Sequence, residues 1–303
     1  MRIQEQPGTG SGTAVLARPG RDRDQGPAGL APGSGRDPAA RRRSALFGPL
    51  LRTLRTAAGA SLDDVARLLD RDRSGVQRME AGLRGIAMDD LAAILDGYGF
   101  AGDGYRSLMG AAHTPFRDWW AGYPAVMTGD FRPYALLELA ASRVLAWQPA
   151  GVPDLVQCPE WALAAARRSP HVQAGDEEKH AAAVAARREA VLSGRYAASL
   201  DVILGSPMPT AAGLGPAAAK QAALLAVPPA GTQVRYAPAA DSWLPPAGPF
   251  TVLEFGSGPV QAVVHLPGPG GGSLITAPRT VGAYISSYQS LDRSARVHRR
   301  PAA

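Results

Sequence analysis

The sequence predicts a multi-domain fold in which an all-α domain of five short helices is followed by an α+β domain with antiparallel strands. Three observations favour this class. Apolar residues follow a helical spacing interrupted by glycines through residues 44–112, the spacing becomes strand-like after residue 195, and an amphipathic helix pattern follows Pro278. With 303 residues and 46% hydrophobic content, the chain has enough apolar material for at least one core, which excludes a wholly disordered protein.

Changes in composition set the expected domain boundaries. Residues 1–43 contain repeated Gly, Pro, Arg and Asp with almost no periodic apolar positions. Such a segment cannot bury enough surface to offset its ordering entropy, so we expect a disordered tail; a start codon assigned too far upstream would leave the same trace. The helical domain is then expected at residues 44–114, the α+β domain at 115–296 and a second disordered tail at 297–303.

The five helices of the first domain are expected from apolar faces and end signals. Gly59 and Gly82 stand where a left-handed residue typically ends a helix. Ser61 is a capping residue, Asp64 three positions later completes a start of the capping-box type, and Asp72 caps the next helix. The five helices are expected near residues 46–58, 62–69, 73–81, 88–98 and 105–112.

The second domain is expected to begin with helices and to continue as strands separated by Pro and Gly clusters. The predicted helices cover residues 131–147, 159–168 and 176–192. The predicted strands cover residues 196–204, 233–236, 250–255, 260–266 and 273–276. A final helix follows Pro278, and its apolar stripe must pack on the sheet or on a second subunit. The stripe consists of Val281, Tyr284, Ile285, Tyr288, Leu291 and Ala295.

Basic residues are concentrated at the two ends of the chain. The formal net charge is +6, and residues 1–43 contribute +4 from eight Arg and four acids. Residues 292–303 contribute +3 from four Arg and one Asp, which leaves −1 for the interior. This distribution is compatible with an anionic partner but does not identify one.

The residue types argue against a metal site, a cofactor site and an active site. The single cysteine, Cys158, cannot form a disulfide within the chain, and none of the five histidines has another at short helical spacing. The sequence contains no Gly-x-Ser-x-Gly, Ser-x-x-Lys or His-Glu-x-x-His motif. The nearest approach to a catalytic pair is Glu254 with His265 on neighbouring predicted strands, which a cross-strand ion pair explains as well. We therefore expect no enzymatic activity, no metal and no cofactor.

The hydropathy pattern argues against a membrane segment. No run of about 18 consecutive apolar residues is present. The first 20 residues also lack the apolar core of a secretory signal. We therefore expect a cytoplasmic protein with no membrane partner.

The segment 61–82 is the most informative part of the sequence, because a tight break joins two short helix patterns there. The positions that face inward are Val65, Ala66, Leu69, Val76 and Met79. The positions that share the outer face of the second helix are Arg73, Ser74, Gln77 and Arg78. A short helix with a polar N-terminal half fits the major groove of DNA, which is about 12 Å wide, and helix-turn-helix docking places such side chains against base edges. We expect these four side chains to contact DNA bases; a merely solvated helix face is the alternative.

Residues 46–98 resemble an Xre-type (lambda-repressor-like) helix-turn-helix domain, and the segment 61–82 is in register with that family without a gap. The resemblance implies an ion pair between Arg55 and Glu80 that ties the first helix to the recognition helix. It also implies that the first domain binds double-stranded DNA.

The chain departs from this family at three positions. Asp70 replaces the usual Gly of the turn, although Asp tolerates the left-handed conformation better than most residues. Gly75 lies inside the recognition helix at a cost of about 1 kcal/mol relative to Ala. Leu62 stands where phage repressors carry a phosphate-binding Gln, so that contact is not expected.

Phosphate affinity must come from the placement of individual groups, because residues 44–112 carry eight Arg and nine acids, a net charge of −1. Arg71 at the turn is the best candidate for a phosphate contact, and Ser61 with the backbone N–H groups of helix starts would assist. The run of Arg41, Arg42 and Arg43 has two possible explanations, a solvated tail or an arm that lies along the DNA phosphates.

Five segments of the second region resemble the C-terminal domain of actinobacterial Xre-type regulators described as antitoxin-like. They are residues 118–120, 137–144, 147–149, 152–157 and 248–255. The resemblance implies a sequence-specific transcriptional regulator, a homodimer on the nucleoid, whose C-terminal domain mediates dimerisation and binds a small acidic protein partner encoded nearby. The alternative is a regulator whose C-terminal domain binds a small-molecule effector. Core packing or such a pocket would account for Trp119, Trp120, Trp147, Trp161 and Trp243.

Overall fold

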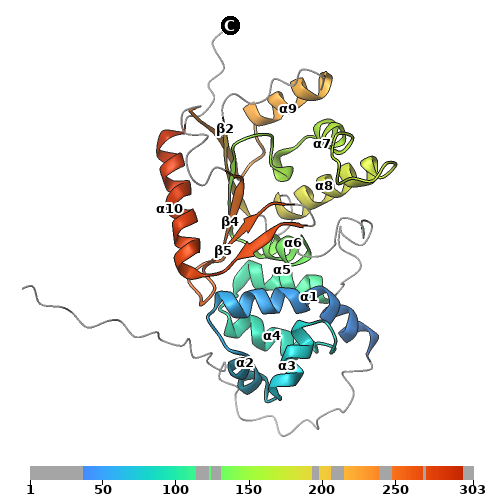
Figure 1. Cartoon of the computed structure of the whole chain (residues 1–303), viewed down its shortest axis with the longest axis vertical. Helices are drawn as coiled ribbons and strands as arrows, with labels where there is room; N and C mark the ends of the chain where they lie inside the picture. The colour runs from blue at the N-terminus through green and yellow to red at the C-terminus, as the bar shows by residue number, and fades with distance from the viewer. Residues whose placement is uncertain are drawn as a thin grey trace, which may run out of the picture.

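The computed structural model describes residues 37–113, 123, 131–192, 198–205, 215–238, 248–268 and 271–295. They form an all-α domain followed by an α+β domain, which confirms the predicted fold class (Figure 1). The predicted tail at 297–303 and residues 1–36 of the other lie outside the described residues. Within these ranges, no helix combines the length and the apolar character that a membrane crossing requires.

The N-terminal domain contains the five predicted helices. They are α1 (Pro38–Ala57), α2 (Leu62–Leu69), α3 (Arg73–Glu80), α4 (Met88–Gly97) and α5 (Gly102–His113). Helix α1 begins earlier than expected, because the Asp37 side chain caps it by accepting hydrogen bonds from the backbone N–H groups of Ala39 and Ala40 at 2.9 and 3.1 Å. Arg43 is buried in this helix, so the expected tail through residue 43 is too long.

The C-terminal domain is a six-stranded sheet with helices on both faces (Figure 1). Its helices are α6 (Phe131–Ala140), α7 (Pro159–Ala166), α8 (Glu177–Leu192), α9 (Pro216–Ala226), α10 (Pro278–Ser294) and the 3₁₀ helix η2 (Asp154–Val156). Its strands are β1 (Arg143–Gln148), β2 (Ser199–Gly205), β3 (Thr232–Ala237), β4 (Phe250–Glu254), β5 (Ala262–Leu266) and β6 (Ser273–Ile275).

The sheet is mixed, with strand order β3-β2-β1-β4-β5-β6. The antiparallel pairs that the sequence predicts join β1, β4, β5 and β6. Strands β1, β2 and β3 are parallel, because helices lie in the connections between them and return the chain to the same edge of the sheet. The prediction of antiparallel strands is therefore wrong for the pairs β1–β2 and β2–β3.

The predicted helix at 131–147 is wrong in its second half. Helix α6 ends at Ala140, and residues 143–148 form β1 in the middle of the sheet. Both faces of β1 are covered, and positions 144–147 are all buried. A strand buried on both faces reads as a continuous apolar run, which periodicity alone does not separate from a buried helix.

The apolar stripe of helix α10 was expected to pack on the sheet or on a second subunit. In the structure it packs on the sheet. Val281, Tyr288 and Leu291 belong to one apolar cluster with strand residues such as Trp147 and Phe250. The phenol O–H of Tyr288 also donates a hydrogen bond of 2.9 Å to the backbone carbonyl of Asp201. Of the other tryptophans, Trp161 is buried in the core, whereas positions 119, 120 and 243 lie outside the described residues.

The two domains share one continuous apolar cluster. Helix α6 packs against both α1 and α5, and its side chains join those of the first domain in that cluster. The backbones also touch: a Cβ atom on Gly99 would lie 2.6 Å from the Cα atom of Gly258, and the N–H of Val260 donates to the carbonyl of Tyr98 at 3.3 Å. The helical domain therefore has a fixed orientation on the α+β domain.

Candidate nucleic-acid interface

Local hydrogen bonds shape the α2-turn-α3 unit. Ser61 and Asp64 form a capping box, in which the Ser61 Oγ accepts from the Asp64 N–H at 3.1 Å and an Asp64 oxygen accepts from the Ser61 N–H at 2.7 Å. Asp70 ends α2 in the left-handed conformation with φ of 53°. The Asp72 carboxylate then accepts a hydrogen bond of 2.6 Å from the Gly75 N–H and begins α3.

The inner side of α3 is held against α1 at very short range. Val76 and Met79 are buried in the core. Gly48 of α1 faces the end of α3 so closely that a Cβ atom there would lie 2.7 Å from the Met79 carbonyl oxygen. The Ser44 hydroxyl donates a hydrogen bond of 3.3 Å to that same carbonyl. Only a residue without a side chain fits at position 48, so the close packing of α1 against the end of α3 requires glycine there.

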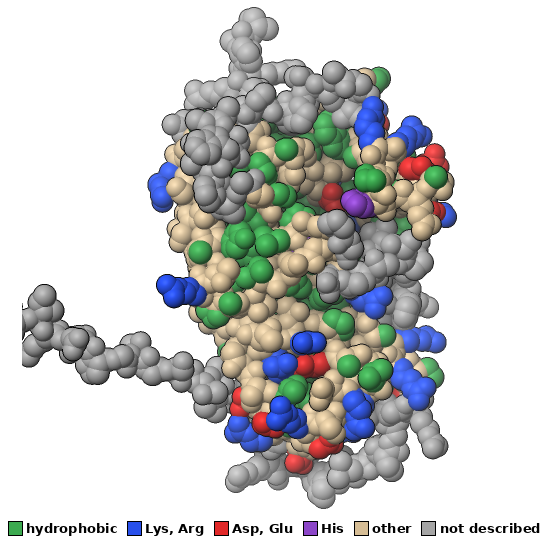
Figure 2. Space-filling view, viewed as in Figure 1, with side chains coloured by type: hydrophobic (Ala, Val, Ile, Leu, Met, Phe, Trp, Pro, Cys, Tyr) green, Lys and Arg blue, Asp and Glu red, His purple; other side chains and the backbone are tan. Residues whose placement is uncertain are grey.

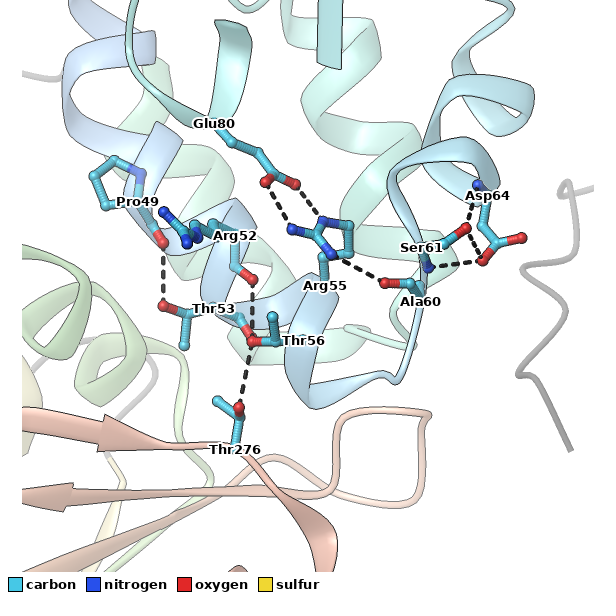
Figure 3. A network of polar contacts seen from close by, with 10 residues as sticks. All are labelled: Pro49, Arg52, Thr53, Arg55, Thr56, Ala60, Ser61, Asp64, Glu80 and Thr276. Carbon is cyan, nitrogen blue, oxygen red and sulfur yellow. Dashed lines mark hydrogen bonds and ion pairs between the residues drawn. The ribbon is translucent and has the colours of Figure 1, made fainter. Parts of the chain in front are cut away.

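Arg55 and Glu80 form a two-pronged ion pair between α1 and α3 (Figure 3). The Arg55 Nε and Nη2 donate to the two Glu80 oxygens at 2.7 and 3.0 Å, and Nη1 donates to the Ala60 carbonyl at 3.1 Å. The hydrogen bond to Glu80 raises the pKa of the Arg55 guanidinium. Because both side chains are largely buried, the pair fixes the rotation of α3 about its own axis.

The outer side of α3 carries the four residues that the sequence predicts as base contacts. Arg73, Ser74, Gln77 and Arg78 are all exposed, and the four other residues of the helix are buried. This exact division follows from the 3.6-residue period of the helix. The structure therefore brings the four side chains together on one solvent-facing surface of a rigidly held helix.

The four side chains differ in their contacts within the protein. Ser74 donates a hydrogen bond of 2.5 Å to Asp72, which lowers the pKa of that carboxylic acid. The Arg73 Nη1 lies 3.7 Å from an Asp63 oxygen. Gln77 and Arg78 have no side-chain hydrogen bond or ion pair to any of the described residues. Gln77 and Arg78 are thus free to contact a ligand without giving up an internal partner.

The two residues predicted as phosphate contacts are already engaged. Ser61 is occupied in the capping box of α2. The Arg71 Nη2 and Nε lie 2.8 and 3.1 Å from one Asp90 oxygen, and about a quarter of the Arg71 side chain remains exposed at 28%. Sequence reasoning missed this partner because Asp90 lies on α4 and only the folded domain brings it to the turn.

Acidic side chains lie among the basic ones on the face of the helical domain that Figure 2 shows. Besides Asp63 beside Arg73 and Asp90 beside Arg71, an Asp72 oxygen lies 3.7 Å from the Arg84 Nη1. Asp63 and Asp72, which precede α3 in the sequence, were the available signal for the pairs with Arg73 and Arg84. Arg71, Arg73 and Arg84 therefore each face a carboxylate, whereas Arg78 has no such partner among the described residues.

A second polar cluster lies inside the C-terminal domain. The Arg187 Nε and Nη2 donate to the two Glu138 oxygens at 2.6 and 2.8 Å, and Nη1 donates to Asp154 at 2.9 Å. Tyr134 donates to Glu138 at 2.7 Å and stacks on the His265 ring with 3.7 Å between ring centroids. Each group that the cluster encloses has a partner within it, so the cluster holds α6, α8 and η2 together.

Glu254 and His265, the nearest approach to a catalytic pair in the sequence, lie on neighbouring strands but not opposite each other. The register of β4 and β5 places His265 opposite Thr251 and Glu254 opposite Ala262. His265 Nε2 lies 2.7 Å from the Gly271 carbonyl oxygen, and burial lowers the pKa of the imidazole. Among the described residues, no three His, Cys, Asp or Glu side chains come close enough to hold a metal ion.

A cavity of about 300 Å³ opens where the two domains meet. The helical domain contributes Phe100 and the start of α5, and the C-terminal domain contributes Phe255 and residues 139–142. The two phenylalanine rings lie 5.3 Å apart between centroids. The cavity is therefore lined by both domains at once.

Two family models match the chain, one for each domain. The model of a helix-turn-helix domain matches residues 46–108, and the model of a domain of unknown function (DUF5753) matches residues 131–300. No curated protein and no solved structure matches the chain significantly.

Proposed function

We propose that this chain, which belongs to the DUF5753 family and carries a helix-turn-helix DNA-binding domain, is a transcriptional regulator that reads a specific DNA sequence with α3. One observation carries the proposal. Helix α3 is held from behind by the pair of Arg55 with Glu80 and presents only polar side chains on its outer face. A rigid, polar helix that projects from a domain surface matches the way in which such helices enter the major groove.

The four outward residues take different parts in this reading. Arg78 is placed to contact guanine through its O6 and N7 atoms, and Gln77 to contact adenine through N6 and N7. Both are free of internal partners among the described residues. Arg73 and Ser74 also contact bases, after exchanging Asp63 and Asp72 for DNA. We expect the largest base preference from Gln77 and Arg78.

Ser61 and Arg71 contact the phosphates on either side of the groove. Arg71 does so with the part of its guanidinium that Asp90 leaves exposed. Hydrogen bonds of this kind fix the register of a protein on the duplex without reading its sequence. Because Asp90 neutralises part of the Arg71 charge, the gain in affinity from this residue is modest.

The regulator acts on the nucleoid as a homodimer. A single helical domain has nearly balanced charge and therefore binds the DNA phosphates weakly. A second copy of the domain doubles the number of phosphate and base contacts. Dimerisation through the C-terminal domain would set the distance between two α3 helices, because the two domains share one core. The half-sites are then expected about 10 base pairs apart, one turn of the duplex.

The C-terminal domain binds a small acidic protein partner encoded nearby, as its resemblance to antitoxin-like regulators implies. Arg279 and Arg293 support this assignment, since both are exposed on α10, whose opposite side is packed on the sheet. An acidic surface would complement these two side chains. Calorimetric titration of the full chain with the product of a neighbouring reading frame tests the assignment, and an Arg279→Glu, Arg293→Glu variant should lose the binding.

The cavity between the domains favours a second candidate function, a regulator that senses a small molecule. Clefts at domain interfaces are common ligand sites. A compound bound in this cavity, beside Phe100 and Phe255, would contact both domains and could change the orientation of α3. Calorimetric titration of the full chain with a panel of metabolites distinguishes the two candidates. Heat released by a metabolite would support the small-molecule sensor. Heat released only by a protein partner would support the regulator that binds a protein.

Selection from a pool of random duplexes tests the DNA-reading proposal. The full chain should enrich one partly palindromic motif at moderate salt, and a variant with both Gln77→Ala and Arg78→Ala should enrich none or a shorter one. Arg106→Ala is the matched control, since Arg106 is an exposed arginine of α5 that pairs with Asp103. A wild-type protein that enriches no motif, at low salt as well, would contradict the proposal.

A further inference from the structure

Leu83 is an exposed apolar side chain directly beyond the recognition helix. Its exposed fraction is 79%, and among the described residues only Val227, also at 79%, is a large hydrophobic residue exposed to this degree. Val227 lies at the end of α9 in the other domain. Leu83 lies three positions after Glu80, where α3 ends.

The end of α3 has the geometry that usually buries this position. Gly82 is left-handed with φ of 74°, its N–H donates to the Met79 carbonyl at 3.0 Å, and the Leu83 N–H donates to the Arg78 carbonyl at 2.8 Å. In this Schellman arrangement the residue after the glycine commonly packs on the last helical turn. Here the helix position that would receive it is Arg78, a polar residue, and Leu83 stays in solvent.

The loop that carries Leu83 is held on both sides. The Arg84 N–H donates to the same Arg78 carbonyl at 3.1 Å. Two residues further on, Ile86 is completely buried, its N–H donates to the Ala40 carbonyl at 3.1 Å, and its carbonyl accepts from Arg43 Nε at 2.9 Å. These hydrogen bonds therefore hold the backbone of Leu83 close to that of Arg78.

From this arrangement we infer that Leu83 is a specificity-determining residue that packs on the C5-methyl group of a thymine next to the base read by Arg78. The inference rests on the proposed function of α3. In the major groove, the thymine methyl is the one apolar group that a base edge presents, and apolar side chains are its usual complement. A leucine gains nothing from a phosphate, so an apolar neighbour is the contact that suits it.

A second copy of the chain is a poorer occupant. Stable dimers bury on the order of 1,200 Å² or more, far beyond what one leucine offers. The residues next to Leu83 in the sequence are Gly82, Arg84 and Gly85, which add no large apolar side chain. The nearest predicted ligand is the DNA that Arg78 would contact.

The test uses the full chain and the duplex that it selects from random DNA. Each thymine of the duplex is replaced in turn by deoxyuridine, which lacks only the methyl group. Wild-type protein should lose about three- to tenfold in affinity at one thymine, and Leu83→Ala should lose about as much on the unmodified duplex. On the duplex with deoxyuridine at that position, Leu83→Ala should cause no further loss, because the two changes remove the same contact.

Three comparisons make the result specific. Val227→Ala, with the same exposure at the other end of the molecule, should bind every duplex as the wild type does. Leu83→Met should keep the thymine preference. Equal losses by Leu83→Ala on thymine and deoxyuridine duplexes, no loss at all, or a loss that sedimentation traces to weaker self-association would each overturn the inference.

The outcome separates this inference from the function on which it rests. If Arg78→Ala relaxes base preference while Leu83→Ala binds normally, the reading function of α3 stands and the role of Leu83 falls. If the wild-type protein selects no motif, both are overturned.

Discussion

Two ion pairs, one from each domain, show opposite uses of arginine in this protein. In the C-terminal domain, Arg187 and Glu138 are 6% and 0% exposed and make two short hydrogen bonds to each other. In the helical domain, Arg73 and Asp63 lie 3.7 Å apart in solvent, at 66% and 60% exposure. The first pair cannot exchange its partner without leaving a buried charge, whereas the second can exchange its carboxylate for a phosphate or a base. The difference indicates which arginines hold the fold and which are available for binding.

Breaking the buried pair should have the largest effect on stability. Arg187→Met removes one charge and leaves Glu138 buried without its partner, which should lower the free energy of unfolding by about 3–5 kcal/mol. Denaturant titration of the full chain measures this. Lys179→Ala, which removes an exposed pair with Asp176, should change stability by less than about 0.5 kcal/mol. Equal effects of the two substitutions would contradict the distinction between buried and exposed pairs.

Arg55 sharpens the comparison, because it lies in the helical domain but is buried like Arg187. Arg55→Ala should cost about 2–3 kcal/mol in stability, since Glu80 is then left buried and unpaired. Arg52→Ala, three residues earlier and exposed, serves as the control. At temperatures where Arg55→Ala is still folded, it should show a weaker base preference than the wild type, because the pair no longer fixes the rotation of α3. An unchanged preference would show that the pair does not orient the helix for reading.

The buried cluster should also make stability depend on pH. Burial lowers the pKa of His265, so the unfolded chain binds a proton more readily than the folded one. Stability should therefore fall as the pH drops below about 6.5 and through the lowered pKa of the folded state. Unfolding titrations between pH 7 and pH 5 should show this loss in the wild type and less of it in His265→Gln. His171→Gln, at an exposed position, should retain the wild-type dependence; an unchanged slope in His265→Gln would show that other groups cause it.

Releasing an exposed pair should give the smallest effect. Asp63→Asn removes the carboxylate beside Arg73 and one negative charge from the surface around α3, so affinity for any duplex should rise a few-fold, by less than about 1 kcal/mol. Fluorescence anisotropy on random duplexes at two salt concentrations measures the gain. Asp103→Asn, on α5, removes the same charge beside Arg106 and should give a smaller gain. Weaker binding by Asp63→Asn would contradict the exchange of partners.

The α2-turn-α3 unit could be predicted closely because its signals are local. The caps at Ser61 and Asp72 and the left-handed turn at Asp70 depend on residues at most three positions away. The ion pair of Arg55 with Glu80, which the family resemblance implied, is present. The contact of Arg71 with Asp90 joins different helices and left no local trace in the sequence.

The C-terminal domain was harder to predict because its elements depend on burial. Strand β1 is covered on both faces and has no polar alternation, so its apolar run was assigned to a helix. Helix α9, in an Ala-rich and Pro-rich stretch, has little apolar face of its own and was missed. Its buried Gln221 shows why: the side chain accepts from the Cys158 N–H and donates to the Val156 carbonyl, which are contacts that only the folded domain provides.

Arg78→Ala is the sharpest test of whether the outer residues of α3 read bases. Quantitative footprinting compares the variant with the wild type on the selected duplex, on its single-base variants and on random DNA. We expect a loss of about 1–3 kcal/mol on the selected duplex with relaxed preference at one base pair, and a clearly smaller loss on random DNA, which reflects only the removed charge. An equal loss on selected and random DNA would show that Arg78 contacts only the phosphate backbone and would contradict the account.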